Sequence, residues 1–358
     1  KRGNPLPGWH SPEQAWAQTQ GQLAWYREME RRGGMTQIAD LGQLEAHLAK
    51  WADGPGDDLP VGYILSLEGA DSMVTLQHLE RSYESGLRAL GPAHYGPGTY
   101  APGTHESGGL GQAGPDLLRE MERLGIILDV THLSDESLDE SMDIFGGTVW
   151  ASHCNCRALV PGQRHLSDDM IQAIADRGGV IGMVFAEPML NPTWDFDNPG
   201  SFSGSVAQRP MAAVIDHIDH VCQLTGNADH VSLGTDLDGG FGREWAPTDY
   251  DTIADLQRFV GMLEARGYSS AERDAIAHGI DPLYVGELVR EGIEGNWSLS
   301  VTKNNKIDQI ANDVDIVVYG EFPDEKALKT YKDHPTYENA IKIVRPLRDK
   351  RIAVDIPA

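Results

Sequence analysis

The chain has 358 residues, 40% of them hydrophobic, so it is long enough for one (β/α)₈ barrel of about 250 residues and a smaller module. Its formal net charge of −25 argues against nucleic acid or an anionic membrane surface as a partner, because both require a basic face. No apolar run approaches the roughly 20 residues of a membrane span, so we expect none.

The three cysteines, Cys154, Cys156 and Cys222, do not resemble a disulfide framework. Cys154 and Cys156 are too close in sequence to pair comfortably. The amino terminus has a basic start with no apolar segment behind it, so no secretory signal is visible. A reducing, cytoplasmic location is therefore expected.

Six apolar segments, separated by helical stretches, are predicted to be buried β-strands. They cover residues 61–67, 87–92, 125–130, 148–152, 179–185 and 231–234. Because a helix separates each pair, successive strands should run parallel, each followed by a crossover helix. The predicted fold class is α/β, a TIM-type barrel of the metal-dependent hydrolase kind, in which the carboxyl ends of all strands meet at the face that holds the active site.

Five of these segments end in a side chain that can carry out chemistry: Glu68, His94, His132, His153 and Asp236. Each has a plainer interpretation by itself. A carboxylate after an apolar strand can cap the next helix, and a lone histidine is more often a hydrogen-bonded polar group than a metal ligand. Two histidines on consecutive strands, with a carboxylate on the same rim, favour a metal site. Neutral imidazole and carboxylate suit zinc, with manganese or cobalt less favoured.

The remaining candidates act on the substrate. His94 could polarise a substrate carbonyl or support a neighbouring group. Asp236 could take a proton from the attacking water and deliver it to a leaving amine. Arg164, in the loop after the fourth predicted strand, could hold a carboxylate in bidentate fashion, and its alternative is a surface ion pair. His217 and Asp219 have metal-ligand spacing, but they fall inside an amphipathic helix, at residues 211–224, away from the rim, and are not expected to bind metal.

Lysine usage changes abruptly near residue 300. The first part has only Lys1 and Lys50, whereas seven lysines follow from Lys303 onward. Such a shift marks a domain junction, which we place between residues 284 and 285, giving domains at 1–284 and 285–358. The second domain is predicted to contain a strand (314–319), a helix (323–331), a second helix (337–347) and a second strand (351–356). This order is that of a small ferredoxin-like α+β module.

This second domain resembles the stress-responsive dimeric α/β-barrel family over about residues 289–356. The matched positions are Tyr319-Gly320-Glu321-Phe322, Ala327-Leu328, Tyr331, His334-Pro335, Arg345-Pro346 and the run 349–355. The resemblance implies pairing of two copies through their sheets, hence a homodimer. The first strand that is usual in that family is not evident here.

The first domain resembles the membrane (renal) dipeptidase family of zinc peptidases over about residues 5–279. Four ordered motifs carry the resemblance: Ser66-Leu67-Glu68-Gly69-Ala70-Asp71-Ser72, Glu120-Met121-x-Arg123-Leu124-Gly125-x-x-x-Asp129-Val130-Thr131-His132, Ala151-Ser152-His153 and Gly234-Thr235-Asp236-Leu237-Asp238-Gly239. It implies that Glu68 bridges two zinc ions and that His132 and His153 bind one of them. It also implies that His94 and Arg164 bind the substrate dipeptide and that Asp236 is the catalytic aspartate.

One departure from that family concerns the other zinc, which takes a His-x-Asp pair from the first barrel strand. No such pair is found on the rim, and the six predicted strands correspond to the third to eighth. We therefore expect a barrel without its first two strands, one zinc rather than two, and weak hydrolysis of dipeptides. Two alternatives stay open: a catalytically weak binding or assembly protein, and a related amidohydrolase acting on another small amide or lactam.

Overall fold

The computed structural model describes residues 10–51, 59–194, 208–237, 239–278, 298–303 and 316–321, together with Lys326, Lys329 and Lys332. The chain divides into two compact units. One comprises Lys1–Ala39 with His47–Gly279, and the other comprises Asp40–Ala46 with Ile280–Ala358. The boundary at residues 284 and 285 that the lysine usage indicates stays a prediction.

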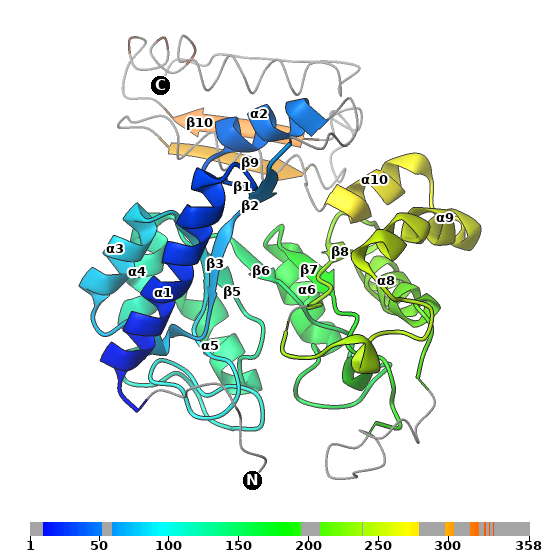
Figure 1. The fold of residues 1–358 in the computed structure, drawn as a ribbon, viewed down its shortest axis with the longest axis horizontal. Coiled ribbons are helices and arrows are strands. Elements are labelled where there is room, and N and C mark those ends of the chain that lie inside the picture. The colour runs from blue at the N-terminus through cyan, green and yellow to red at the C-terminus, as the bar shows by residue number, and fades with distance from the viewer. Residues whose placement is uncertain are drawn as a thin grey trace. The chain divides into compact units, whose positions relative to one another are not determined.

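The first unit is built on a six-stranded parallel sheet in which the spatial order of the strands equals their order in the chain (Figure 1). Its strands are β3 (Leu65–Glu68), β4 (Leu87–Gly91), β5 (Ile127–Asp129), β6 (Val149–Ala151), β7 (Val180–Met183) and β8 (Val231–Leu233). All five pairings are parallel. This succession is that of a TIM-type barrel, and the predicted α/β fold class is confirmed. Among the described strands, β3 and β8 each have one neighbour in this sheet.

The predicted strand at residues 61–67 is wrong in its extent. The chain forms β2 (Val61–Tyr63), which pairs in parallel with β1 (Met35–Gln37), and enters β3 only after Ile64. Strand β1 was not predicted, because three residues with two polar side chains carry no detectable alternation. The apolar run at 61–67 is continuous in sequence but serves two separate sheets, a division that only the pairing partners decide.

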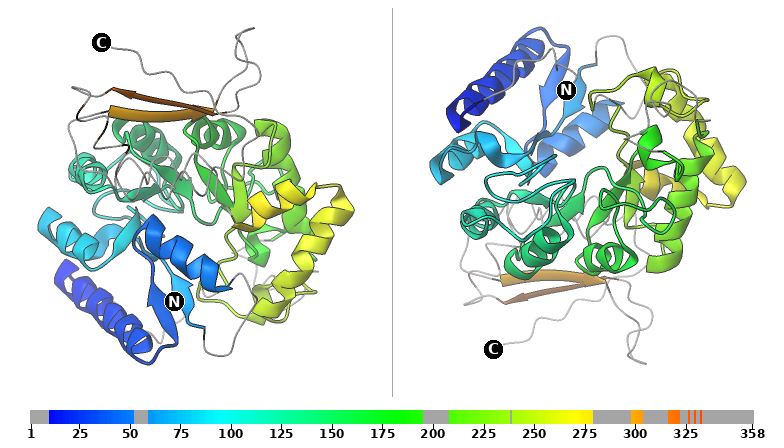
Figure 2. Two further views of the ribbon diagram at one scale, coloured as in Figure 1. Left: turned by 90° about the horizontal axis from the view of Figure 1, so that it is seen from above. Right: turned by 90° about the horizontal axis from the view of Figure 1, so that it is seen from below.

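Helices precede and follow the strands along the chain. They are α1 (Pro12–Arg31), α2 (Leu41–Trp51), α3 (Leu76–Glu84), α4 (Gly114–Leu124), α5 (Asp135–Ile144), α6 (Asp168–Asp176), α8 (Ala212–Thr225), α9 (Gln257–Arg266) and α10 (Ser270–His278). Figures 1 and 2 show α1 lying beside α3, where the ring of Trp16 meets that of His78 edge-on at 4.7 Å. The predicted helix at 211–224 corresponds to α8.

Local sequence explains where several helices begin and end. Ser134 and Ser167 cap α5 and α6 by accepting the N–H groups of Ser137 and Met170, as side-chain oxygens do at helix N-termini. Helix α4 ends at Gly125, which takes a left-handed conformation with φ 71° and turns the chain into β5. These caps fix the distance from each helix to the next strand, and so the place of each strand end.

The core is one continuous apolar cluster between the sheet and its helices. Leu90 and Leu128 of the central strands are fully buried, as is Met121 of α4. Phe185, just after β7, packs against Phe259 of α9 with ring centroids 5.6 Å apart. Burying these side chains supplies the main stabilisation of the sheet, and it leaves the strand ends free to carry polar groups.

The second unit contains β9 (Ser298–Lys303) and β10 (Ile316–Glu321), which pair antiparallel with Ile316 opposite Lys303. Strand β10 confirms the predicted strand at 314–319, shifted by two residues. Strand β9 corrects the expectation that no earlier strand is evident. Lys326, Lys329 and Lys332 are helical, in keeping with the helix predicted at 323–331, whereas the predicted elements at 337–347 and 351–356 lie outside the described residues.

Among the described helices, none combines the length and the apolar character that crossing a membrane requires.

Candidate active site

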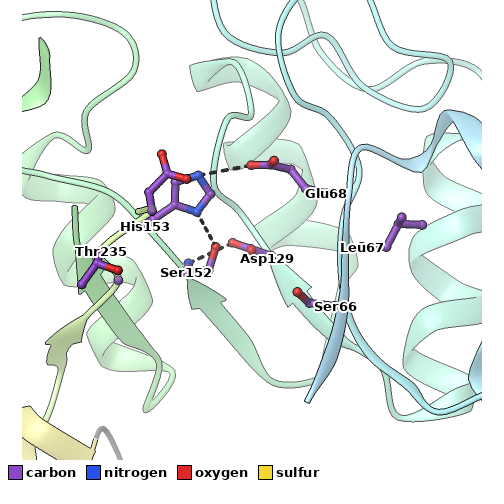
Figure 3. A pocket seen from close by; sticks show the side chains of 9 residues that line it. Ser66, Leu67, Glu68, Asp129, Ser152, His153 and Thr235 are labelled. Carbon is purple, nitrogen blue, oxygen red and sulfur yellow. Dashed lines mark hydrogen bonds and ion pairs between the residues drawn. The ribbon is translucent and has the colours of Figure 1, made fainter. Parts of the chain in front are cut away.

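The carboxyl ends of the parallel strands bring the candidate side chains together. Glu68 is the last residue of β3, His132 follows β5, His153 follows β6, and Asp236 follows β8. A cavity of about 310 Å³ lies at these ends (Figure 3), lined by Ser66, Leu67, Glu68, Asp129, Ser152, His153, Gly234, Thr235 and Asp236. Residues that lie up to 170 positions apart in the sequence therefore share one small space.

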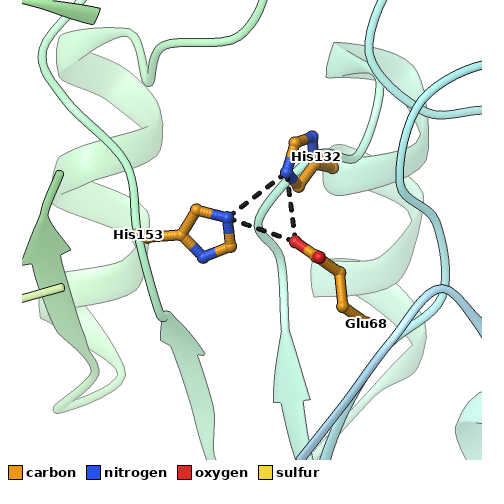
Figure 4. Close-up of side chains that lie close together, drawn as sticks. All are labelled: Glu68, His132 and His153. Atoms are coloured by element: carbon orange, nitrogen blue, oxygen red, sulfur yellow. Dashed lines mark hydrogen bonds and ion pairs between the residues drawn. The ribbon is translucent and has the colours of Figure 1, made fainter. Parts of the chain in front are cut away.

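Glu68, His132 and His153 point toward a common centre (Figure 4). Oε1 of Glu68 lies 3.2 Å from Nε2 of His132 and 3.2 Å from Nε2 of His153. The two Nε2 atoms are 3.3 Å apart. The His132 side chain is 3% exposed and that of Glu68 is 45% exposed, so the group is closed on the protein side and open toward the solvent.

This arrangement fits a zinc ion. Ligands placed tetrahedrally at roughly 2.0–2.1 Å from zinc are about 3.3–3.4 Å from one another. The three ligand atoms have nearly this spacing, and they leave a fourth position open, as catalytic zinc sites do. Within the described residues this is the one group of histidine, cysteine and carboxylate side chains with metal-site spacing.

Two hydroxyl groups set the orientation of the histidines. Thr104 Oγ1 lies 2.9 Å from Nδ1 of His132, and Ser152 Oγ lies 2.8 Å from Nδ1 of His153. With each Nδ1 occupied, each Nε2 faces the centre of the site, which is how partners of metal-binding histidines fix ring and tautomer. Asp129 Oδ1 accepts the N–H groups of both Thr131 and Ser152 and so joins the ends of β5 and β6.

Neither hydroxyl was picked out from the sequence. Ser152 directly precedes His153, so its proximity could have been noticed. Thr104 lies 28 residues from His132 in an irregular loop, and no local pattern indicates that contact.

The charges of the group suit metal binding. Burial and the nearby charge of Arg164 outweigh the opposing effect of Glu68 and together lower the pKa of His132 to about 3, so this imidazole is neutral at physiological pH. Partial burial alone would raise the pKa of Glu68, but its hydrogen bonds with His132 and His153 outweigh burial and hold that pKa well below its usual range. An ionised carboxylate and neutral imidazoles are the protonation states in which these side chains bind zinc.

His94 and Tyr95 lie on the open side of this group. Nε2 of His94 is 3.7 Å from Oε2 of Glu68, and half of the His94 side chain is exposed. The Tyr95 ring packs against the rings of His94 and His132, with centroids 4.9 Å and 5.0 Å away. Burial raises the pKa of the Tyr95 phenol, while the charge and hydrogen bond of Arg164 oppose that shift. Tyr95 was not predicted as a site residue.

Arg164 does not form the surface ion pair that was the alternative interpretation of its sequence position. Its guanidinium donates from Nη2 to the carbonyl of His153 at 2.8 Å and from Nη1 to Sγ of Cys154 at 3.3 Å. The buried Nε has no hydrogen-bond partner. Among the described carboxylates, none lies within 4.0 Å of it, so its charge is available to an anionic ligand.

Asp236 lines the same cavity from the opposite strand. Burial raises the pKa of its carboxyl, which favours proton exchange at a pH closer to neutrality. A Cβ atom at Gly239 would overlap the Asp236 carboxylate, so a larger residue there would displace this side chain. His217 of α8, in contrast, is buried and accepts the backbone N–H of Cys156 at 3.1 Å through Nδ1.

Comparison with known proteins supports the resemblance to the membrane dipeptidase family. The family model described as membrane dipeptidase (peptidase family M19) matches residues 28–279. An uncharacterized protein of Klebsiella pneumoniae, named for the region 5′ of pqqA, is 29% identical over 258 residues, covering 67% of this chain and 90% of its own length. An uncharacterized dipeptidase of Schizosaccharomyces pombe is 27% identical over 169 residues, covering 47% of this chain and 38% of its own.

A solved structure has a similar fold. A metallopeptidase from Rhodobacter sphaeroides, bound to a phosphinate mimic of the dipeptide L-Ala-D-Ala, superposes with a TM-score of 0.63 at 26% identity. The match covers 76% of this chain and 75% of the metallopeptidase. At the other end, the stress responsive A/B barrel domain model matches residues 269–358. Since the first family model spans well over half of the sequence and includes the strand ends that carry Glu68, His132 and His153, the chain belongs to the membrane dipeptidase family, peptidase family M19.

Proposed function

We propose that this chain hydrolyses dipeptides with a zinc ion held by Glu68, His132 and His153. The observation that carries the proposal is that His153 contacts both the metal-binding group and Arg164. Its imidazole faces Glu68, and its backbone carbonyl holds the guanidinium of Arg164. The imidazole that faces Glu68 and the carbonyl that holds the guanidinium thereby belong to the same residue.

The attachment of the metal-binding group and of the Arg164 guanidinium to one residue favours a short substrate. A guanidinium binds a carboxylate through two parallel hydrogen bonds. If Arg164 binds the terminal carboxylate of a peptide, we expect one residue to lie between this carboxylate and a peptide carbonyl at the metal side. A longer peptide would place an amide, which carries no charge, beside Arg164. Selection for dipeptides follows from this spacing.

The remaining groups have roles in the reaction that match their positions. A zinc ion bound by the three ligands would polarise the scissile carbonyl and acidify a water molecule. Asp236, whose pKa is raised by burial, accepts the proton of the attacking water and delivers it to the leaving amine. His94, half exposed beside Glu68, donates a hydrogen bond to the carbonyl oxygen as negative charge develops on it.

Relatives support the substrate class. The Rhodobacter sphaeroides metallopeptidase binds a mimic of a dipeptide, and the Schizosaccharomyces pombe relative is named a dipeptidase. The chain spans only 38% of the length of the latter, so the activity of the whole protein is part of the proposal.

The test combines metal content with hydrolysis. The purified chain is incubated with zinc and dialysed, bound metal is measured by mass spectrometry, and hydrolysis of L-Ala-L-Ala and L-Ala-D-Ala is followed. We expect about one zinc per chain from the described ligands, and a loss of bound zinc and of hydrolysis in Glu68→Gln. Glu84→Gln, which changes an exposed carboxylate at the end of α3, is the matched control and should alter neither.

Two outcomes would contradict the proposal. Zinc binding without hydrolysis of any dipeptide, together with hydrolysis of a lactam, would indicate a related amidohydrolase. Equal zinc content in Glu68→Gln and in the unchanged chain would show that the metal lies elsewhere.

A further inference from the structure

We propose that Cys154 is a positioning residue for substrate binding, whose thiol holds the guanidinium of Arg164 in the orientation that receives the substrate carboxylate. The inference deepens the proposed dipeptidase function and rests on it.

The contacts of Arg164 define this orientation. Nη1 donates to Sγ of Cys154 at 3.3 Å, and Nη2 donates to the carbonyl of the preceding residue, His153, at 2.8 Å. Two acceptors on neighbouring residues fix the plane of the guanidinium. The Nε–H is left without a partner although it is buried. A buried N–H donor without an acceptor costs free energy, and a ligand that accepts a hydrogen bond from it offsets this cost.

The same thiol belongs to the hydrogen-bonded chain that orients His153. Cys154 Sγ donates to Thr131 Oγ1 at 3.8 Å, and Thr131 Oγ1 lies 3.3 Å from Ser152 Oγ. Ser152 Oγ in turn lies 2.8 Å from Nδ1 of His153. A displacement of the thiol therefore affects the guanidinium directly and the imidazole only through two weak intermediate contacts. We expect substrate binding to depend on Cys154 more strongly than the chemical step does.

A thiol suits this position because it accepts a hydrogen bond without adding charge. A carboxylate in its place would form an ion pair with Arg164 and compete with the substrate. Cys154 is 2% exposed, so water does not replace it as the acceptor. With only the thiol, a backbone carbonyl and a phenol among its described partners, Arg164 keeps its positive charge for the ligand.

The experiment compares Cys154→Ala with Cys156→Ala in the zinc-loaded full chain. Both variants remove a buried thiol from the same loop, but Sγ of Cys156 donates to the carbonyl of His217 and does not contact Arg164. For L-Ala-L-Ala we expect Cys154→Ala to raise KM about 3- to 10-fold, as the loss of one modest hydrogen bond does, with kcat changed less than about 2-fold. Cys156→Ala should leave KM unchanged, and Cys154→Ser should restore part of the loss.

A carboxylate-free substrate and a binding measurement complete the test. For L-Ala-L-Ala amide, Cys154→Ala should have no effect on KM, and Arg164→Gln should make the Cys154→Ala change neutral for the free dipeptide as well. Calorimetric binding of L-Ala-L-Ala to the zinc-free chain should show the same 3- to 10-fold weakening in Cys154→Ala.

The outcomes separate the two proposals. If the unchanged chain binds the dipeptide but does not hydrolyse it, the proposed function fails, and the calorimetric comparison still decides the role of Cys154. An unchanged KM and Kd in Cys154→Ala, an equal effect on the amide, or a loss confined to kcat would each overturn the inference. So would the absence of dipeptide binding by the unchanged chain.

Discussion

Individual residues at this site adopt backbone conformations that folding alone does not favour. Three described non-glycine residues have a positive φ, and two of them are His132 (φ 70°) and Asp236 (φ 56°). Such conformations are uncommon for residues with a Cβ atom and are often found where a side chain must be aimed for function. Both residues stand just past a strand end, where the turn directs the imidazole and the carboxylate toward the cavity.

The hydroxyl of Thr104 should contribute to metal affinity although it touches no metal position. Thr104→Val keeps the shape of the side chain and removes the partner of Nδ1 of His132, which frees the ring and its tautomer. We expect zinc affinity to fall by about 10- to 100-fold, measured by competition with a chromophoric chelator. Thr225→Val, which removes a hydroxyl bonded to backbone on α8, should leave the affinity unchanged. Equal losses in both variants would show a general destabilisation instead.

At the scale of elements, glycines allow the strands behind the site to approach closely. A Cβ atom at Gly234, just past β8, or at Gly182, in β7, would overlap the carbonyl oxygen of Ser152. The carbonyl belongs to the segment that presents His153. The spacing of β6, β7 and β8 at their carboxyl ends therefore depends on two positions without side chains, and Ser152 cannot move without moving the imidazole.

Gly234→Ala should consequently damage both the stability and the site. The added methyl group forces β8 from the end of β6, and we expect a loss of about 1–3 kcal/mol in the free energy of unfolding, the usual cost of overpacking. Gly261→Ala in α9 is the matched control. Its Cβ meets nothing within 4 Å, and it should stabilise the chain by about 0.5–1 kcal/mol through helix propensity. Urea unfolding followed by circular dichroism measures both, and a neutral Gly234→Ala would contradict the close approach.

At the scale of the whole molecule, two buried histidines outside the metal-binding group add to the effect of His132 in making stability depend on pH. Burial lowers the pKa of His165 to about 3, with Arg164, His217 and Arg157 adding to the shift. Burial also lowers the pKa of His217 to about 4.

The charged neighbours of His217 act in both directions. Asp216 opposes the lowering of its pKa, while His220 and Arg209 reinforce it. Both histidines nevertheless remain neutral in the folded chain under conditions in which the unfolded chain ionises them.

Acid should therefore destabilise the zinc-free protein well above the range where carboxylates titrate. Below the unfolded pKa of about 6.5 the unfolded state binds protons that the folded state does not, so stability falls with pH by about 1.4 kcal/mol per unit for each histidine. From pH 6.5 to 5 the two contribute a loss of roughly 3 kcal/mol. The fall continues until the folded pKa values of about 3 and about 4 are reached.

The measurement is urea unfolding at several pH values in the presence of a chelator. His165→Asn should remove the share of one histidine, about 1.4 kcal/mol per pH unit below the unfolded pKa, whereas His10→Asn, at an exposed position, should retain the full pH dependence. A pH dependence that is identical in the unchanged chain and in His165→Asn would contradict this account.

Much of the fold and the centre of the site could be predicted from the sequence. Apolar segments long enough for one strand, alternating with amphipathic helices, permit little except a parallel sheet with crossover connections. Because the carboxyl ends of such strands meet, Glu68, His132 and His153 could be grouped before any coordinates were known, and the structure places them together. The expected homodimer, the cytoplasmic location and the individual roles of the site residues stay predictions.

Only the tertiary structure decided the division of residues 61–67 between two sheets, the pairing of β9 with β10, and the contacts of Thr104 and Cys154. A strand or helix can be predicted from the periodicity of its own residues, since burial on one face repeats along the chain. A strand edge, a ring nitrogen or a guanidinium finds its partner in a distant segment that folding brings within about 3 Å. The local periodicity of the sequence does not indicate which segment this is. The sequence by itself therefore determined which residues can do chemistry at the strand ends, and the tertiary structure determined how those residues are held.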